Sequence, residues 1–396
     1  MTPADQLPYL LRHADKVVPE DELLEKLKSG RQLRVKLGLD PTAPSVTLGW
    51  AVVLRKLRHF QEMGHTAVLI VGDFTARVGD PSLRSDTRKR LTAEEVNGYA
   101  ENVLGQFRKV LLDERLEIRR NSEWLGALDM GGLLELTSAA TVAQMLERSD
   151  FANRYQEGSP ISVMEFLYPL LQGYDSVAVE ADVELGGSDQ LWNLMMGRVV
   201  QERYGQEPQV ALTMPLLVGT DGSKKMSQSI GNYIGVEDPP SDMFGKTMSI
   251  PDQVMPEWFR LAADFDPGDV DSIESGLDSG ELHPGEVKRQ LARAVTALYW
   301  GDEAAAGAEA GFDQVFRHGG IPDGIEDFSL PAGDTVQMSA LVRGVSGESG
   351  SEARRLLAQG AVRLDGEAVA DGEMAREALL GRVLKVGKRR FVRLAE

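Results

Sequence analysis

Residues 66–74 of the chain are TAVLIVGDF. This continuous apolar run ends in Gly-Asp, a pattern typical of a parallel strand that is buried on both faces and opens onto a site at its carboxyl end. Residues 33–41, LRVKLGLDP, predict a second strand that runs into a turn. Between the two, a helix that ends near Gly64 is predicted by apolar residues at helical spacing: Trp50, Val53, Leu54, Leu57 and Phe60. The first 75 residues therefore predict strand, helix, strand.

The same alternation continues downstream. It predicts a helix over Thr92–Leu111, a strand over Leu116–Arg120, helical segments over Thr141–Ala178, a strand around Val183 and a helix over Gln190–Tyr204. This order is typical of an α/β fold with a doubly wound parallel sheet. We expect a Rossmann-like catalytic domain over residues 1–220, a helical domain with a linker over 221–330, and a small α+β domain over 331–396.

Composition excludes several classes of protein. The 396 residues contain 43 Lys+Arg and 61 Asp+Glu, a formal charge of -18, so contact with nucleic acid must come from a local basic patch. The chain has no cysteine, which excludes disulfides, thiol nucleophiles and cysteine-ligated metals. We find no signal peptide and no apolar run of about 18 residues, and we expect a cytoplasmic protein.

The last 66 residues differ in charge from the rest. Residues 331–396 carry a net charge of +2, which leaves -20 for the remainder. The segments AVRLDGEAVA and GRVLKVGKRRFVRLA predict hairpins, and the second places Lys388, Arg389 and Arg390 in one turn. Such a turn is suited to RNA phosphates, and with Arg354 and Arg355 it forms the candidate RNA-binding set. Taken alone, the same residues are also compatible with a solvated basic surface, which we consider the less favoured alternative.

Three glycine-containing loops are expected at the carboxyl edge of the sheet. They are residues 38–42 with 47–50, residues 72–80, and residues 186–190. Glycine-lined strand ends beside helix N-termini favour a nucleotide, because backbone N–H groups and the helix dipole face the phosphates. None of the loops has the G-x-G-x-x-G or G-x-x-x-x-G-K-[ST] spacing, and each taken singly is compatible with an ordinary turn.

A polar stripe marks the helix that contains YPLLQGYDS. Tyr168, Gln172 and Asp175 lie at i, i+4 and i+7, on one face of that helix. A satisfied buried network is one explanation of the stripe. Because the helix leads into the loop Gly186–Gln190, the other explanation is a pocket for a small polar molecule such as an amino acid.

A third motif follows the apolar residues MPLLVG. It is Lys224-Lys225-Met226-Ser227-Gln228-Ser229. A lysine on such a loop can neutralise charge that develops on a phosphate leaving group. A Lys-Lys pair on a loop is otherwise ordinary solvated surface.

In this order and spacing, DPTAPSVTLGW, GDFTARVGDPS, YPLLQGYDSVAVEADVELGGSDQ, MPLLVG and KMSQS resemble the bacterial tyrosyl-tRNA synthetases, which are class I aminoacyl-tRNA synthetases. The resemblance covers nearly the whole chain, and its most specific part is the polar stripe joined to the Gly-Gly-Ser-Asp-Gln loop. The last 66 residues are similar to the ribosomal-protein-like RNA-binding domain of bacterial members. The resemblance implies activation of tyrosine by ATP to tyrosyl-adenylate and transfer to tRNA(Tyr), without a covalent enzyme intermediate.

The resemblance also implies roles for individual residues. Asp175 accepts the hydrogen bond of the substrate phenol, and phenylalanine is rejected because it would leave this carboxylate unpaired. The other tyrosine-binding positions are Asp40, Asp80, Tyr168, Gln172 and Gln190, with Asn121 and Trp124 supporting the pocket. The ATP-binding positions are Gly38, Thr42, Gly187, Asp189, Lys224, Met226 and Ser227. The positions that handle phosphate in catalysis are Thr47, Gly49, Trp50, Lys225 and Gln228, with Arg84 and Arg88 from the basic loop SLRSDTRKR.

The chain departs from the family pattern at both phosphate motifs. The His-x-Gly-His motif of class I synthetases reads Thr47-Leu48-Gly49-Trp50 here, and Gln228 replaces the second lysine of Lys-Met-Ser-Lys-Ser. The five histidines of the chain, His13, His59, His65, His283 and His318, lie outside the first motif. Three phosphate-handling groups are therefore missing, while the amino-acid pocket is intact.

Three hypotheses remain open from the sequence. The first is a tyrosyl-tRNA synthetase with altered phosphate contacts. The second is a duplicated synthetase with weak or no activation that binds tyrosine, tyrosyl-adenylate or tRNA. The third is a non-enzymatic RNA-binding protein. For the first, the family implies a homodimer and Mg²⁺ that enters with ATP, since we find no cluster with metal-ligand spacing.

Overall fold

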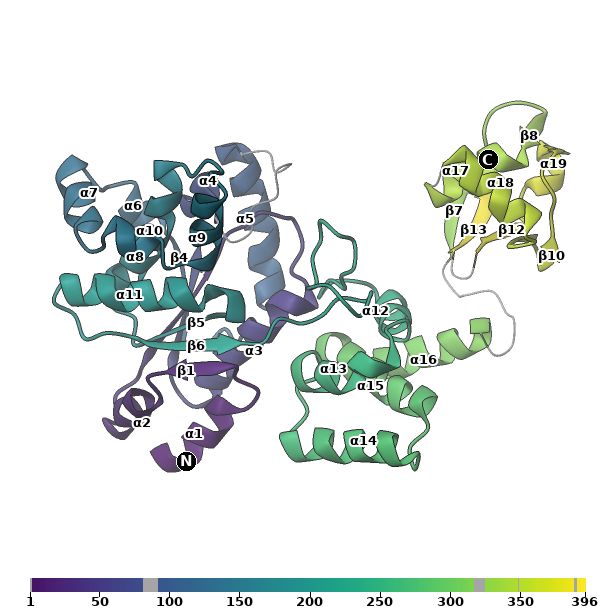
Figure 1. Cartoon of the computed structure of the whole chain (residues 1–396). Helices are drawn as coiled ribbons and strands as arrows, with labels where there is room; N and C mark the ends of the chain where they lie inside the picture. Colours follow the sequence, from purple (N-terminus) through teal and green to yellow (C-terminus); the bar gives the residue numbers. More distant parts are fainter. Residues whose placement is uncertain (1, 81–91, 317–324, 348, 388–389) are drawn as a thin grey trace. The chain divides into compact units, whose positions relative to one another are not determined.

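The computed structural model describes residues 2–80, 92–316, 325–347, 349–387 and 390–396 (Figure 1). The chain forms two compact units, Met1–Ala305 and Ala306–Glu396. The predicted division into three domains at residues 220 and 330 stays a prediction.

The first unit is built on a six-stranded sheet in the order β1-β6-β5-β2-β3-β4. Its strands are β1 (Lys16–Val18), β2 (Arg34–Leu39), β3 (Thr66–Val71), β4 (Leu116–Arg120), β5 (Val183–Gly187) and β6 (Val210–Met214). Strands β2 to β6 are parallel to one another, and β1 is an antiparallel edge strand paired with β6. The predicted α/β fold and four of its strands are confirmed, whereas β1 and β6 were not predicted from the sequence.

Burial explains the apolar character of β3. Residues 67–71 are all buried, because helices cover both faces of the parallel sheet. The helices of this part are α1 (Pro3–Leu11), α2 (Glu20–Lys28), α3 (Leu48–Glu62), α4 (Thr75–Val78), α5 (Ala93–Phe107), α6 (Ser122–Leu125), α7 (Met130–Thr137), α8 (Val142–Met145), α9 (Ser149–Gln156), α10 (Val163–Ala178), the 3₁₀ turn η2 (Ser188–Gln190) and α11 (Leu191–Arg203).

A helical region follows the sheet. It contains α12 (Pro240–Thr247), η3 (Asp252–Val254), α13 (Met255–Leu261), α14 (Pro267–Ser279), α15 (Pro284–Trp300) and α16 (Asp302–Phe316), of which the last extends into the second unit. Trp258 and Phe259 of α13 are fully buried and belong to the same hydrophobic core as Val35 and Leu212 of the sheet. One core therefore holds the sheet and helices α13–α15 together.

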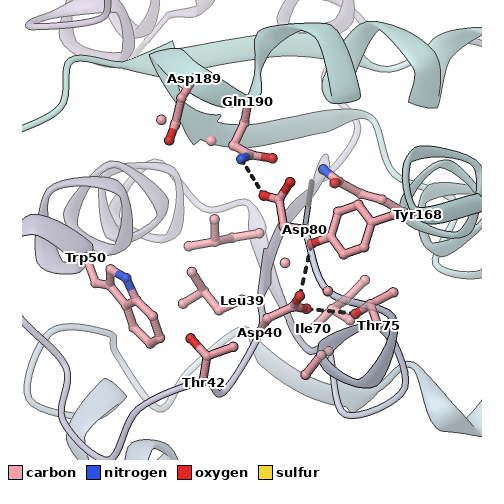
Figure 2. Close-up of a pocket in the computed structure, with 18 of the residues that line it drawn as sticks. Leu39, Asp40, Thr42, Trp50, Ile70, Thr75, Asp80, Tyr168, Asp189 and Gln190 are labelled. Atoms are coloured by element: carbon pink, nitrogen blue, oxygen red, sulfur yellow. Dashed lines mark hydrogen bonds between the residues drawn. The ribbon is translucent and has the colours of Figure 1, made fainter. Parts of the chain in front are cut away.

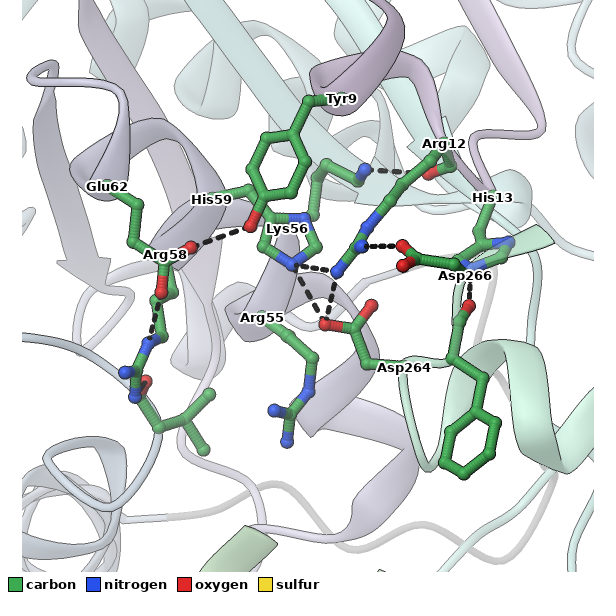
Figure 3. Close-up of polar contacts among 12 residues, drawn as sticks. Tyr9, Arg12, His13, Arg55, Lys56, Arg58, His59, Glu62, Asp264 and Asp266 are labelled. Carbon is green, nitrogen blue, oxygen red and sulfur yellow. Dashed lines mark hydrogen bonds and ion pairs between the residues drawn. The ribbon is translucent and has the colours of Figure 1, made fainter. Parts of the chain in front are cut away.

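A polar network ties helix α3 to the same region (Figure 3). The Arg12 guanidinium contacts the carboxylates of Asp264 and Asp266, each at 2.7 Å, and His59 Nε2 lies 3.0 Å from Asp264. Burial lowers the pKa of His59 and lowers the pKa of Lys56 to about 7. These contacts hold α3 against the segment after α1 and the loop after α13.

The second unit has its own core of residues between Leu330 and Leu394. Its elements are β7 (Glu326–Ser329), β8 (Thr335–Gln337), α17 (Met338–Ser346), α18 (Gly350–Ala358), β9 (Val362–Leu364), β10 (Glu367–Ala368), β11 (Glu373–Ala375), α19 (Arg376–Leu379), β12 (Val383–Val386) and β13 (Arg390–Ala395). The sheet order is β10-β9-β12-β13-β7, with β11 and β8 as a separate pair. Strands β9 and β10 pair antiparallel, as do β12 and β13, so both predicted hairpins are confirmed.

Within the described residues, none of the helices combines the length and the apolar character that crossing a membrane requires.

Candidate active site

A cavity of about 430 Å³ opens at the carboxyl ends of β2, β3 and β5 (Figure 2). The three predicted glycine-containing loops all contribute to its wall. Fourteen residues that the sequence predicts for the site line it: Gly38, Asp40, Thr42, Gly49, Trp50, Asp80, Tyr168, Gln172, Asp175, Gly187, Asp189, Gln190, Lys225 and Met226. The structure thus brings these predicted residues together around one cavity, and their roles stay predictions.

The loop after β2 meets the loop after β3 at the floor of the cavity. Thr75 Oγ1 donates to Asp40 Oδ1 at 2.7 Å, and Tyr168 OH donates to Asp40 Oδ2 at 3.0 Å. A Cβ atom at Gly72 would lie 2.1 Å from Asp40 Oδ1, so only glycine allows this approach. The glycine after β3 therefore serves the placement of a carboxylate.

The predicted polar stripe of α10 faces the cavity. Tyr168 is 7% and Asp175 3% exposed, and Gln172 lies between them on the cavity wall. The Asp175 carboxylate accepts hydrogen bonds from Trp124 Nε1 at 2.7 Å and from Asn121 Nδ2 at 3.2 Å. Burial raises the pKa of Asp175 to about 6, against the opposing effects of Lys36 and these two donors. The carboxylate is thus held in one orientation by two donors outside the cavity.

Asp40 is a second carboxyl in the cavity, and its side chain is partly buried. Burial and the neighbouring carboxylates Asp80 and Asp175 raise its pKa to about 7, against the hydrogen bonds from Thr75 and Tyr168. The mutual repulsion of Asp40, Asp80 and Asp175 favours a cationic group in the cavity, because an ammonium ion relieves it. The site is therefore suited to the amino group of a small molecule.

Asp80 belongs to a further network on the opposite wall. Gln190 Nε2 donates to Asp80 Oδ2 at 3.0 Å, and Arg148 Nη2 lies 3.4 Å from Asp80 Oδ1. Asn193 Nδ2 donates to Gln190 Oε1 at 2.8 Å, which fixes the orientation of the Gln190 side-chain amide. This wall therefore presents the carboxylate of Asp80 next to the side-chain amide of Gln190, the N-cap residue of α11.

The Lys-Met-Ser loop lies against the N-terminus of α3. Met226 Sδ accepts from Gly49 N at 3.3 Å, and Lys225 Nζ forms a 2.6 Å ion pair with Asp189. Gln228 Nε2 donates to the main-chain oxygen of Ser45 at 2.6 Å. Two helix N-termini and a lysine thus border the outer part of the cavity, an arrangement that suits phosphate groups.

Four of the predicted residues are placed outside the cavity wall. Thr47, 3% exposed, is the N-cap of α3, and its hydroxyl accepts from Trp50 N at 3.3 Å. Lys224, Ser227 and Gln228 belong to the loop but are not among the described residues that line the cavity. Arg84 and Arg88 lie outside the described residues.

The candidate RNA-binding residues lie in the second unit. Arg354 and Arg355 are exposed on α18, where Arg355 forms an ion pair with Glu352, and Arg390 begins β13. Lys388 and Arg389 lie outside the described residues. The structure leaves the RNA-binding role of this set as a prediction.

Sequence reasoning missed four side chains that support the site. Thr75 contacts the carboxylate of Asp40, and Arg148 contacts that of Asp80. A threonine within the loop 72–80 and a single arginine carry no special sequence signal. Lys36 and Glu184 form a buried ion pair beneath α10. A signal for this pair did exist, because each is a charged residue between apolar neighbours in a predicted buried strand, although Arg34 and Asp182 share that feature.

Comparison with known proteins identifies the family. A family model described as class I tRNA synthetases (W and Y) matches residues 28–317. The tyrosine–tRNA ligase of Moorella thermoacetica is 49% identical over 395 residues, which cover 99% of this chain and 96% of that protein. The chain belongs to the tyrosine–tRNA ligase family. The member from Thermotoga maritima is 48% identical over 395 residues, covering 100% of this chain and 98% of that protein.

Solved structures of the same family share the fold. A tyrosyl-tRNA synthetase from Archaeoglobus fulgidus, complexed with L-tyrosine, superposes with a TM-score of 0.62 at 25% identity and covers 77% of this chain and 99% of that chain. A C-terminally truncated mitochondrial tyrosyl-tRNA synthetase from Aspergillus nidulans gives a TM-score of 0.66 at 20% identity, covering 80% of this chain and 94% of that chain.

Proposed function

We propose that the chain activates tyrosine with ATP and transfers the tyrosyl group to tRNA(Tyr), using phosphate contacts that differ from the family motifs. The observation that carries this proposal is the position of Asp175, a buried carboxylate at the inner end of a cavity whose outer part is bordered by helix N-termini and Lys225. Membership of the tyrosine–tRNA ligase family supports it.

The inner part of the cavity binds tyrosine. Asp175 accepts the phenol O–H, which phenylalanine lacks, and a buried acceptor left without its donor costs about 1–3 kcal/mol. Asp80, Tyr168 and Gln172 hold the α-ammonium group, with Asp40 fixed behind Tyr168 by their 3.0 Å hydrogen bond. Gln190 lies near the substrate carboxylate.

The outer part of the cavity binds ATP. Asp189 holds the ribose with main-chain groups of Gly38 and Gly187, while Thr42, Lys225 and the N-terminus of α3 face the phosphates. The tyrosine carboxylate attacks the α-phosphorus, the bond to the β-phosphate oxygen breaks, and pyrophosphate leaves. Lys225 must then exchange its ion pair with Asp189 for the phosphates.

Mg²⁺ enters this reaction as part of the ATP substrate. Among the described residues there is no group of three or more His, Asp or Glu side chains that could hold a metal ion. The phosphate oxygens of ATP therefore supply the ligands of Mg²⁺. The residues named above orient these phosphates.

Tyrosine-dependent exchange of labelled pyrophosphate into ATP tests the proposal. We expect exchange by the natural chain, and faster exchange by a Thr47→His, Trp50→His, Gln228→Lys variant, because each restored phosphate contact typically contributes a few kcal/mol. Calorimetric titration with tyrosine runs in parallel. Absence of exchange together with tyrosine binding contradicts the proposal and supports the duplicated synthetase, and absence of both supports the RNA-binding alternative.

We also propose that the chain acts as a cytoplasmic homodimer. Five large apolar residues are strongly exposed on α7–α10, namely Met130, Leu134, Val142, Tyr155 and Val163, with exposures between 64% and 77%. Large apolar side chains exposed to this extent favour an interface with another protein surface. Light scattering is expected to give twice the chain mass, and Leu134→Glu to give the monomer, whereas Leu282→Glu, at a separate exposed leucine, leaves the dimer intact. A monomeric natural chain contradicts this assignment.

A further inference from the structure

A buried ion pair lies beneath the polar stripe of α10. Lys36 of β2 and Glu184 of β5 are neighbours in the register of these parallel strands. Lys36 Nζ lies 2.9 Å from Glu184 Oε1, and the two side chains are 0% and 1% exposed. A buried ion pair is often no more stabilising than an apolar pair of the same volume. The pair is therefore better explained by what it does to its neighbours than by stability.

The ammonium group of Lys36 connects the sheet to α10 on both sides of Asp175. It donates to the main-chain oxygen of Gln172 at 2.8 Å and to Ser176 Oγ at 2.7 Å. With Glu184 as third partner, all three N–H donors of the lysine are used. Two of these contacts are on residues that flank Asp175 in the helix, so they fix the backbone that bears its carboxylate.

The carboxylate of Glu184 orients the side chain of Gln172. Gln172 Nε2 donates to Glu184 Oε1 at 3.0 Å, and Ser176 and Gln209 also donate to this carboxylate. A carboxylate only accepts hydrogen bonds, so the amide must turn its nitrogen toward Glu184 and its oxygen away. The Gln172 oxygen is then the atom available to an ammonium group in the cavity.

The charge of Lys36 also acts on Asp175. Among the groups that oppose the effect of burial on the pKa of Asp175, Lys36 acts most strongly, ahead of Trp124 and Asn121. Glu184 acts in the opposite direction and more weakly. Removal of the Lys36 charge therefore raises the pKa of Asp175, and removal of the Glu184 charge lowers it.

We propose that Lys36 and Glu184 are positioning residues of the tyrosine site: the pair turns the oxygen of Gln172 toward the substrate ammonium group and holds the turn of α10 that bears Asp175. This inference rests on the proposed function of the same cavity. It makes the pair a determinant of selection for tyrosine over phenylalanine, although neither side chain reaches the cavity wall.

Calorimetric titration of the full chain with tyrosine and with phenylalanine, from pH 5 to pH 8.5, tests the proposal. For Lys36→Met we expect tyrosine affinity at pH 6 to fall about tenfold or more and the midpoint of its pH dependence to move upward. Phenylalanine affinity changes less, so discrimination decreases. For Glu184→Gln we expect the midpoint to move downward, since a negative charge is removed and the amide can still accept from Gln172.

Lys26→Met is the matched control. Lys26 is 4% exposed and pairs with Glu207 at 2.6 Å, but it belongs to α2 and does not line the cavity. The Lys26→Met variant also loses a buried lysine charge. We expect its tyrosine affinity to have the same pH midpoint as that of the natural chain. A purely structural role of Lys36 would lower stability without midpoint shifts of opposite sign in the two variants.

The outcomes separate the two proposals. If the natural chain does not bind tyrosine, the proposed function fails. If it binds and selects tyrosine but Lys36→Met keeps its midpoint and its selectivity, the positioning proposal is overturned. Should Lys36→Met not fold, Glu184→Gln decides alone, and an unchanged or raised midpoint overturns the proposal.

Discussion

Gln228 Nε2 donates to the main-chain oxygen of Ser45 across 2.6 Å, and this hydrogen bond joins the Lys-Met-Ser loop to the segment that precedes helix α3. The residue that departs from the second family motif therefore contacts the chain two residues before Thr47, which departs from the first. A neutral amide at position 228 suits this contact, and it leaves Lys225 as the cation of the loop on the cavity wall.

Loss of this hydrogen bond is expected to weaken ATP binding. Gln228→Ala removes a contact that contributes about 0.5–1.5 kcal/mol, so the KM for ATP in pyrophosphate exchange should rise roughly two- to tenfold while tyrosine affinity stays the same. Ser229→Ala is the control, because Ser229 is exposed in the same loop and its hydroxyl contacts only that of Ser227 among the contacts described. Equal KM values for the two variants would show that the Ser45 contact does not order the loop.

Substitution of Asp175 is expected to abolish selection for tyrosine. Asp175→Ala removes the acceptor for the phenol and leaves Trp124 Nε1 without its 2.7 Å partner. Tyrosine affinity should fall on the order of a hundredfold, and phenylalanine should then bind about as well as tyrosine. Calorimetry with both amino acids measures this. Discrimination equal to that of the natural chain would remove Asp175 from the phenol site.

Tyrosine binding is expected to weaken as the pH falls. The pKa of Asp175 is raised to about 6 and that of Asp40 to about 7, so both carboxyls take up protons between pH 8 and pH 5. Protonation of Asp175 removes the negative charge of the acceptor for the phenol. None of the three ionising groups of free tyrosine titrates in the middle of this range. Affinity should therefore be highest near pH 8 and decline through pH 6, as titrations in matched buffers would show; constant affinity down to pH 5 contradicts this assignment.

The same two carboxyls have an opposite effect on folding. Their pKa values in the folded chain lie above the value of 3.8 for an unperturbed Asp, so the unfolded state loses these protons first. The unliganded protein consequently loses stability from this source as the pH rises from about 4 to 7. Bound tyrosine, whose ammonium group compensates these charges, should raise the melting temperature more at pH 8 than at pH 5.

The fold could be predicted from periodicity, but the roles of several site residues could not. The continuous apolar run in residues 66–74 predicts a buried parallel strand. Strand β3, in which five of the six residues are buried, confirms it. Strand β1 was missed because its pairing with β6 depends on residues almost 200 positions away. Thr47 has the sequence position of a catalytic group, whereas its hydroxyl caps α3, a role that depends on where the helix begins.

The support beneath the site was the least predictable part. Lys36 and Glu184 each interrupt an apolar strand, but only the register of β2 and β5 shows that the two charges are neighbours. Likewise, the spacing of Tyr168, Gln172 and Asp175 predicts a shared helix face and nothing about the donors Trp124 and Asn121 that orient Asp175. Local spacing thus identifies the residues that line the cavity, and tertiary contacts decide what orients them.

Removal of the second unit is expected to separate tyrosine binding from tRNA binding. A chain truncated after Phe316 retains the cavity, because every lining residue lies in the first unit. The truncation also removes β7 together with its partner strand β13. Tyrosine affinity and tyrosine-dependent pyrophosphate exchange should be unchanged. Affinity for tRNA(Tyr), measured by filter binding at two salt concentrations, should fall at least tenfold, with a smaller salt dependence because basic contacts are lost. Undiminished tRNA affinity in the truncated chain would rule out the second unit as the main RNA-binding element.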